Sequence, residues 1–267
     1  LSKPYSNADW LLSHLVRGVE FSDRAATLLD APWSAMVDGA AGIGSGDPAA
    51  IEVLMETILI SGFSMAIAGT SAPASGGEHL VSHYWDMEQH CQHEPIRALH
   101  GTQVGIGTLM SALVIERLIA LTADDIDPAA AAARRPNATW IDAIDGDHPH
   151  LTPDVLASIK DQIRAKQRHA GDLADELTAV RARWDEIRER LATVLVPPAR
   201  VWSALVEADC PRRATDINVS VEHAIRTLRV CRHIRNRYVA LDLADDLGLL
   251  EQWAPDIVAL TQAGAPT

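Results

Sequence analysis

Three histidines stand at spacings that could build one reactive site. His79 and His83 are four residues apart, so on a helix they share one face. His100 follows 21 residues after His79, a natural separation for a helix, a turn and the start of a second helix. Three imidazoles, or two with a carboxylate, suit a divalent transition metal that keeps one position open for substrate. The spacing alone leaves two interpretations open: such a site, or three unrelated helical histidines.

The carboxylates beside these histidines exclude one enzyme class. Glu78 precedes His79 instead of following it, so the H-E-x-x-H arrangement of metalloproteases, with its general base, is missing. Glu78 and Asp86 could orient an imidazole, or they could be solvated carboxylates on a helix surface. The remaining histidines are expected to be solvated or structural, and they are His14, His90, His93, His148, His150, His169, His223 and His233.

The elements that must position the histidines are helices. A Gly/Ser/Pro-rich loop over 69–77 leads into a predicted helix over 78–89, and an apolar helix is predicted over 101–121. Residues 6–29 predict a first helix. Residues 48–68 are apolar nearly all round, which predicts a central buried helix. No segment alternates convincingly as a strand would, so the predicted fold class is all-α.

Composition and charge restrict the partners. The chain has 267 residues and a net charge of −13, which argues against binding nucleic acid or an anionic membrane surface. Its three cysteines, Cys91, Cys210 and Cys231, are far apart and lack C-x-x-C spacing, which indicates free thiols in a reducing, cytoplasmic compartment. No signal peptide or membrane span is expected, because the longest apolar stretch contains Glu52 and Glu56.

Several stretches together resemble a known enzyme family. The loop 71–79 (SAPASGGEH), the pair Ser82-His83 and the segment 99–108 (LHGTQVGIGT) are similar to the second domain of the sn-glycerol-1-phosphate dehydrogenase family. That family belongs to the iron-containing alcohol dehydrogenase and dehydroquinate synthase-like superfamily. Asp9-Trp10 resembles the D-W pair that follows the family's first metal-binding segment, and 234–249 resembles its C-terminal helices. The likeness therefore spans nearly the whole chain, although residues 124–215 contribute little to it.

The resemblance implies a role for each histidine. The family's two histidine metal ligands fall on His79 and His100, and a histidine that binds substrate near the reacting carbon falls on His83. The third ligand, an aspartate, aligns just before Leu1. The family's α/β nucleotide-binding domain also lies upstream, so the cofactor-binding residues are expected outside this chain. Residues 1–267 are then one helical metal- and substrate-binding domain of a longer protein.

The activity implied by the resemblance is a metal-dependent, NAD(P)H-linked interconversion of dihydroxyacetone phosphate and sn-glycerol 1-phosphate, a step of phospholipid biosynthesis. Zinc is the first choice of metal, and nickel or iron also suits imidazole and carboxylate ligands. A related polyol dehydrogenase, a dehydroquinate synthase-like cyclase and a non-catalytic helical interaction module remain alternatives. Broad apolar helices would allow a homodimer.

One position departs from the family pattern. The family often has arginine between the serine and proline of the loop, where this chain has Ala72. A phosphate-bearing substrate would then need another cation. The candidates are Lys3, Arg97, Arg235 and Arg237.

Overall fold

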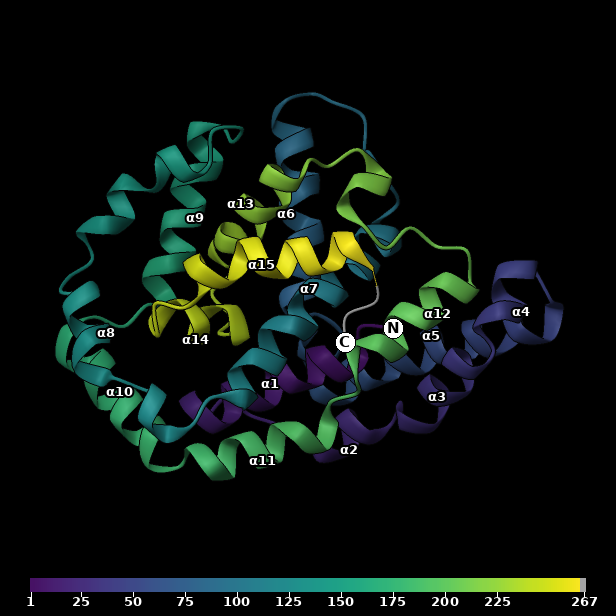
Figure 1. The fold of residues 1–267 in the computed structure, drawn as a ribbon, viewed down its shortest axis with the longest axis horizontal. Helices are drawn as coiled ribbons and strands as arrows, with labels where there is room; N and C mark the ends of the chain where they lie inside the picture. Colours follow the sequence, from purple (N-terminus) through teal and green to yellow (C-terminus); the bar gives the residue numbers. More distant parts are fainter. Residues whose placement is uncertain (265–267) are drawn as a thin grey trace.

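The computed structural model describes residues 1–264, and within them the chain is all-α, as predicted, with no strand (Figure 1). The α-helices are α1 (Lys3–Arg17), α2 (Asp23–Thr27), α3 (Asp30–Asp38), α4 (Ala40–Ser45), α5 (Pro48–Ala68), α6 (Gly77–Cys91), α7 (His100–Ala120), α8 (Pro128–Arg134), α9 (Pro153–Lys166), α10 (Ala170–Ala182), α11 (Trp184–Val194), α12 (Pro198–Glu207), α13 (Val221–Val230), α14 (Ala240–Asp246) and α15 (Leu250–Ala263). Short 3-10 turns lie at Ala72–Ala74, Ala123–Asp125, Thr139–Asp147, Ala214–Ile217 and Cys231–Ile234.

Helix α7 is the central helix of the fold. It is apolar on all sides, and α1, α6, α11, α12, α14 and α15 pack around it (Figure 1). Its closest neighbour is α6. A Cβ atom on Gly107 would lie 2.5 Å from the backbone oxygen of Glu78, so glycine is required where the two helices approach each other. This close contact brings the start of α7 beside the first turns of α6.

The sequence-based prediction of a central, buried helix over 48–68 is wrong. Helix α5 occupies this segment and begins where expected, with the Asp47 side chain accepting a hydrogen bond from the Ala49 nitrogen at 3.1 Å. However, only Thr57 and Ser64 of α5 are buried. An apolar composition alone does not predict which of two apolar helices is central. In the structure the other helices pack around α7 instead of α5. By length and composition alone, α5 and α7 are both apolar enough to cross a membrane.

The predicted first helix over 6–29 is also wrong in its extent. Helix α1 begins at Lys3 and ends at Arg17, because Gly18 adopts a left-handed conformation with φ of 66° and its nitrogen bonds back to the His14 carbonyl. Two short helices, α2 and α3, follow. Asp9 therefore lies inside α1, where its side chain faces the core.

Asp9 joins three helices. Its carboxylate accepts hydrogen bonds from the backbone nitrogen of Gly77, the first residue of α6, at 2.6 Å, and from that of Ala240, the first residue of α14, at 2.7 Å. Both nitrogens lack partners within their own helices, so one buried side chain caps two helix starts. Burial, together with the nearby Glu78 carboxylate, raises the pKa of Asp9 to about 7 despite these bonds.

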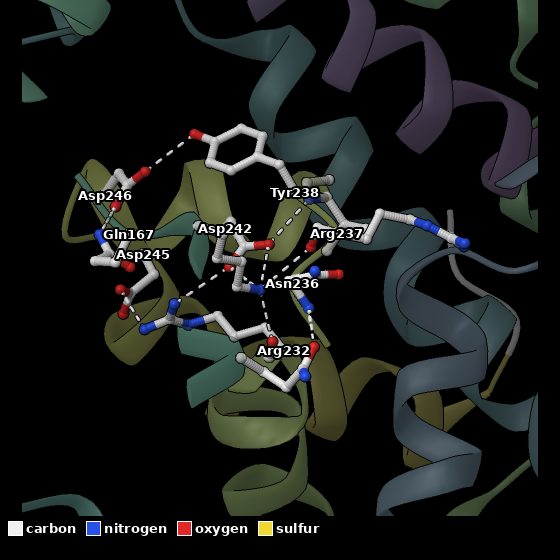
Figure 2. A network of polar contacts seen from close by, with 12 residues as sticks. Gln167, Arg232, Asn236, Arg237, Tyr238, Asp242, Asp245 and Asp246 are labelled. Carbon is white, nitrogen blue, oxygen red and sulfur yellow. Dashed lines mark hydrogen bonds and ion pairs between the residues drawn. The ribbon is translucent and has the colours of Figure 1, made fainter. Parts of the chain in front are cut away.

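A buried polar network holds the segment between Cys231–Ile234 and α14 (Figure 2). The Lys166 ammonium lies 2.7 Å from Asp242 Oδ1 and donates to the Arg232 carbonyl at 2.6 Å and the Arg237 carbonyl at 3.2 Å. Asp242 Oδ2 accepts from the Val239 nitrogen at 3.0 Å. The network therefore fixes the backbone of residues 235–239, which lies beside the histidine-bearing helix α6.

Lys166→Met is expected to lower the free energy of unfolding by about 3 kcal/mol, because it removes one member of a buried ion pair. Urea unfolding followed by circular dichroism measures this change. Lys160→Met is the matched control, since Lys160 and Asp145 form a more exposed pair that is expected to contribute about 1 kcal/mol or less. Equal effects of the two substitutions would contradict the structural role given to the buried network.

Candidate functional site

The three histidines at the start of α6 and α7 lie together. Their ring centres are 5.3 Å apart for His79 and His100, 5.1 Å for His83 and His100, and 6.0 Å for His79 and His83. Two imidazoles on one tetrahedral zinc ion, with Zn–N bonds of about 2.0–2.1 Å, have ring centres roughly 5 Å apart. The ring spacings of His79 and His83 from His100 are close to this value, and the assignment of individual ligands remains a prediction.

Glu78 determines which nitrogen of His79 can ligate. Its Oε1 lies 2.8 Å from His79 Nδ1 and also accepts the Gly76 nitrogen at 2.9 Å. Because a carboxylate accepts, Nδ1 carries the proton and Nε2 keeps its lone pair. Glu78 is completely buried, and its Oε2 has no hydrogen-bond partner among the described residues. It is thus an orienting group and not a solvated helix-surface carboxylate.

A series of hydrogen-bonded side chains likewise determines which nitrogen of His100 can bind a metal. The Gln103 nitrogen Nε2 lies 2.9 Å from Asp86 Oδ1 and 3.0 Å from the Ala98 carbonyl, both acceptors. Its Oε1 therefore accepts from the Ser82 hydroxyl at 2.9 Å. The Ser82 oxygen then accepts from His100 Nδ1, 2.8 Å away. His100 Nε2 is left with its lone pair, as a metal ligand requires.

By the distances between ligand atoms, a different set lies together among the described residues. His83, Asp86 and His100 can each bring one ligand atom within 4.8 Å of the others. Asp86 Oδ1, however, already accepts from Gln103, and Asp86 Oδ2 lies 3.9 Å from His100 Nδ1, the nitrogen that bonds Ser82. The hydrogen-bond pattern therefore favours ligation by His79 and His100 through Nε2.

The environment disfavours the charged form of two of the imidazoles, His83 and His100. Burial, reinforced by the neighbouring rings of His100 and His79, lowers the pKa of His83 to about 4. Burial and His79 also lower the pKa of His100. Neutral imidazole is the form that binds metal ions, so both groups are ready to ligate or to accept a hydrogen bond at neutral pH.

The histidines line a cavity of about 1150 Å³. Polar lining comes from the histidines, from residues of the loop 71–76 and from the segment 235–239. Apolar lining comes from side chains of α3, α5 and α12 and from the residue between α2 and α3. These include Leu29, Trp33, Met36, Leu54, Met65 and Leu205. Leu1 also lines the cavity.

Three of the four predicted cations line this cavity. Lys3 donates to the Pro73 carbonyl at 2.6 Å, and burial lowers the pKa of Lys3 to about 8. Arg237 binds the loop through the Ser75 carbonyl and through Ser71 Oγ, and Arg235 is exposed. Arg97, by contrast, is absent from the lining and pairs with Glu94 at 3.3 Å.

The structure also explains the departure at Ala72. This side chain is buried in a small apolar cluster with Trp10, Ala25 and Ala26, and it does not line the cavity. A longer side chain there would meet Trp10. The cations of the lining are therefore Lys3 and the two arginines of the segment 235–239, none of which belongs to the loop.

Sequence reasoning missed the two residues that orient His100. Ser82 was noted only as part of the resemblance, and Gln103 was not singled out. The one available signal was that Gln103 lies three residues after His100, on the same face of a helix. The bonds that join Ser82, Gln103 and Asp86 cross between α6 and α7, so only the packed structure shows them.

The comparisons with known proteins agree with the resemblance. No protein-family model matches the chain. A "Glycerol-1-phosphate dehydrogenase [NAD(P)+]" of Staphylothermus marinus is 39% identical over 110 residues, which cover 41% of this chain and 30% of that protein. Proteins of the same name from Halorubrum lacusprofundi and Bacillus velezensis are 40% identical over 103 residues and 42% identical over 106 residues. These matches cover 39% of this chain in each case, and 28% and 26% of the two relatives.

The resemblance read from the motifs is thus confirmed, over about two fifths of the chain. The match spans less than a third of each relative's length, 30% in the Staphylothermus marinus protein.

Gln103→Leu is expected to weaken zinc affinity about tenfold or more, because His100 loses the group that orients it. Ser82→Ala is expected to act in the same direction. Competition titration against a chromogenic zinc chelator measures the affinity. Ser111→Ala removes a buried hydroxyl of α7 that has no partner among the described residues, and should leave affinity unchanged. Unchanged affinity in Gln103→Leu would exclude the relay to His100.

Proposed function

We propose that this chain is the metal- and substrate-binding part of an NAD(P)H-dependent enzyme that interconverts dihydroxyacetone phosphate and sn-glycerol 1-phosphate. The observation that carries the proposal is one cavity lined by three adjacent imidazoles and a group of cations. The imidazoles can hold a divalent metal and a substrate oxygen, and the cations can hold a phosphate. The names of the similar proteins supply the same substrate class.

His79 and His100 would hold the metal through their Nε2 atoms. Bound there, a divalent cation would act as a Lewis acid on the substrate carbonyl oxygen. Glu78 and the Ser82–Gln103 pair would fix the two rings, so that little conformational freedom is lost when the ion binds. The proposed third ligand is an aspartate just before Leu1. Leu1 lines the cavity, so a residue directly before it would enter at the site.

His83 would hold the substrate beside the metal. It lies one helical turn from His79 on the same face, and its ring stacks near that of His100. As a neutral imidazole it offers one donor and one acceptor. It can therefore bind a substrate hydroxyl and pass a proton between that hydroxyl and solvent.

Arg235 is the proposed phosphate-binding cation. It is exposed at the cavity and close enough to His83 to affect that ring's pKa, and it forms no ion pair within residues 1–264. Arg237 and Lys3 already bind the carbonyls of the loop 71–76, so they would hold the loop and add positive potential. A guanidinium suits phosphate because two of its donors can bind two oxygens.

The hydride would come from a nicotinamide cofactor carried by a part of the protein outside this chain. The relatives are longer, and their name includes NAD(P)+. We propose that residues 1–267 form one domain and that an α/β nucleotide-binding domain covers the cavity from the open side. This arrangement would exclude water from the reacting carbon.

Removal of one proposed ligand should release the metal. His79→Ala and His100→Ala are each expected to lower zinc content well below that of the unmodified chain, with helical content preserved. His83→Ala should retain zinc, because His83 is proposed to bind substrate. Zinc content after dialysis, measured by mass spectrometry, distinguishes these outcomes, and His169→Ala serves as a control distant from the cavity. Zinc loss in His83→Ala would make it a ligand instead.

The substrate assignment is tested in the longer protein that contains this chain. Arg235→Gln is expected to raise KM for dihydroxyacetone phosphate at least tenfold, since one charge-assisted contact to phosphate is lost. Rates with unphosphorylated dihydroxyacetone should not change. Arg97→Gln is the control, because Arg97 lies outside the cavity. NAD(P)H oxidation is the readout, with zinc present.

Other outcomes of the same assay assign the alternatives. Turnover of dihydroxyacetone alone would indicate a polyol dehydrogenase. Absence of turnover with either compound, in protein that retains zinc, would contradict the proposal and favour a cyclase or a non-catalytic module.

A further inference from the structure

Three buried side chains outside the cavity form a continuous hydrogen-bonded bridge. The Tyr84 hydroxyl lies 2.9 Å from His148 Nδ1, and His148 Nε2 lies 3.0 Å from His233 Nδ1. Their exposed fractions are 0% for Tyr84, 1% for His148 and 4% for His233. None of the three lines the cavity, and the proposed reaction uses none of them. Two histidines buried in this way call for a role of their own.

The bridge joins the two elements that would bind substrate. Tyr84 directly follows His83 on α6. His233 stands two residues before Arg235. His148 belongs to neither element, since it comes from the connection between α8 and α9. We propose that His148 is a positioning residue, which sets the distance between His83 and Arg235 by bonding to both elements at once. The consequence for substrate binding rests on the proposed function.

The Lys166 network does not supply this connection. Lys166 bonds to Asp242 and to two carbonyls of the segment 231–239, and none of these belongs to α6. Within residues 1–264, no hydrogen bond or ion pair passes directly from α6 to the segment 231–239. The two elements also touch through apolar side chains, but such contacts are not directional. The directional link is therefore the one through His148.

The bond between the two histidines needs at least one neutral ring. A neutral imidazole has one donor nitrogen and one acceptor nitrogen, whereas a protonated imidazole has two donors. With one extra proton on the pair, one ring can still donate to the other. With both rings protonated, the N–H groups at His148 Nε2 and His233 Nδ1 would face each other across 3.0 Å. Acid should therefore open the bridge.

Burial keeps the bridge intact at neutral pH. It lowers the pKa of His148 to about 4, and it lowers the pKa of His233 well below the usual value. An exposed histidine has a pKa of about 6.5, so the open state binds protons more readily. The stability that the bridge contributes is complete above about pH 6.5 and is lost as the pH falls toward 4. The charged groups that face His148 are Glu88 of α6, Asp145, Arg226 of α13 and Arg232, and those that face His233 are Arg232, Lys166 of α9 and Arg135.

Activity of the longer protein that contains this chain tests the positioning role. Tyr84→Phe removes one hydroxyl from the bridge and is expected to raise KM for dihydroxyacetone phosphate about threefold, as the loss of one hydrogen bond would. His148→Leu removes both bonds and should raise this KM about tenfold. Zinc content and rates with unphosphorylated dihydroxyacetone should stay the same, because the imidazole cluster is unchanged. His148→Gln, which can still bond to one neighbour, should restore part of the loss.

Tyr5→Phe is the matched control. Tyr5 is 1% exposed, its hydroxyl donates to the Val196 carbonyl at 2.8 Å, and it does not line the cavity. This variant loses the same group from an equally buried place and should keep the KM of the unmodified protein. Equal KM values for Tyr84→Phe and Tyr5→Phe would overturn the proposal. So would equal losses with the phosphorylated and unphosphorylated compounds.

Hydrogen exchange measures the bridge without catalysis. If the unmodified protein turns over neither compound, the proposed function fails, and exchange still decides whether the bridge holds the segment 231–239. After correction for the intrinsic effect of pH, backbone exchange in this segment should be faster at about pH 5 than at about pH 7. Tyr84→Phe should accelerate it at both pH values, with exchange in α15 unchanged. The same exchange in Tyr84→Phe and the unmodified protein, or no acceleration in acid, would contradict the proposal.

Discussion

A single buried carboxylate connects the parts of this chain that form the candidate site. Asp9, inside α1, accepts the first backbone nitrogens of α6 and α14. His79 follows two residues after Gly77, and the cationic segment 235–239 ends just before Ala240. One side chain therefore sets how far the histidines stand from the arginines. Burying it is costly, as its raised pKa shows, and that cost is offset by capping two helix starts at once.

A second set of buried polar side chains holds the other side of the cationic segment. Lys166, Arg232 and Asp242 are buried and form ion pairs, and Lys166 and Asp242 also bond to backbone atoms of residues 232–239 (Figure 2). A loop held in this way keeps its conformation without a substrate. The site thus combines a rigid imidazole cluster on two closely packed helices with a rigid loop that presents cations to it. Such preorganisation is what binding a small charged substrate requires.

Local patterns predicted some features of the site and missed others for physical reasons. The pairing of His79 with His83 was predictable because residues i and i+4 share a helix face. The place of His100 was predictable because a turn brings the start of the next helix back beside the first helix. The bonds from Ser82 and Gln103 to His100 depend on packing between helices. The choice between α5 and α7 as the central helix was not predictable from hydrophobicity, since both are apolar. The close approach of α6 to α7 at Gly107 is possible because glycine lacks a Cβ atom, and it places α7 at the centre.

Anomalous diffraction at the zinc edge, from crystals of the zinc-loaded chain, tests the central claim most directly. The account predicts one strong peak within about 2.0–2.1 Å of the Nε2 atoms of His79 and His100, with His83 Nδ1 and Nε2 both outside bonding distance. A peak bonded to His83, Asp86 and the Nδ1 atom of His100 would contradict it. That result would mean that the Ser82–Gln103 pair does not determine which nitrogen of His100 binds the metal.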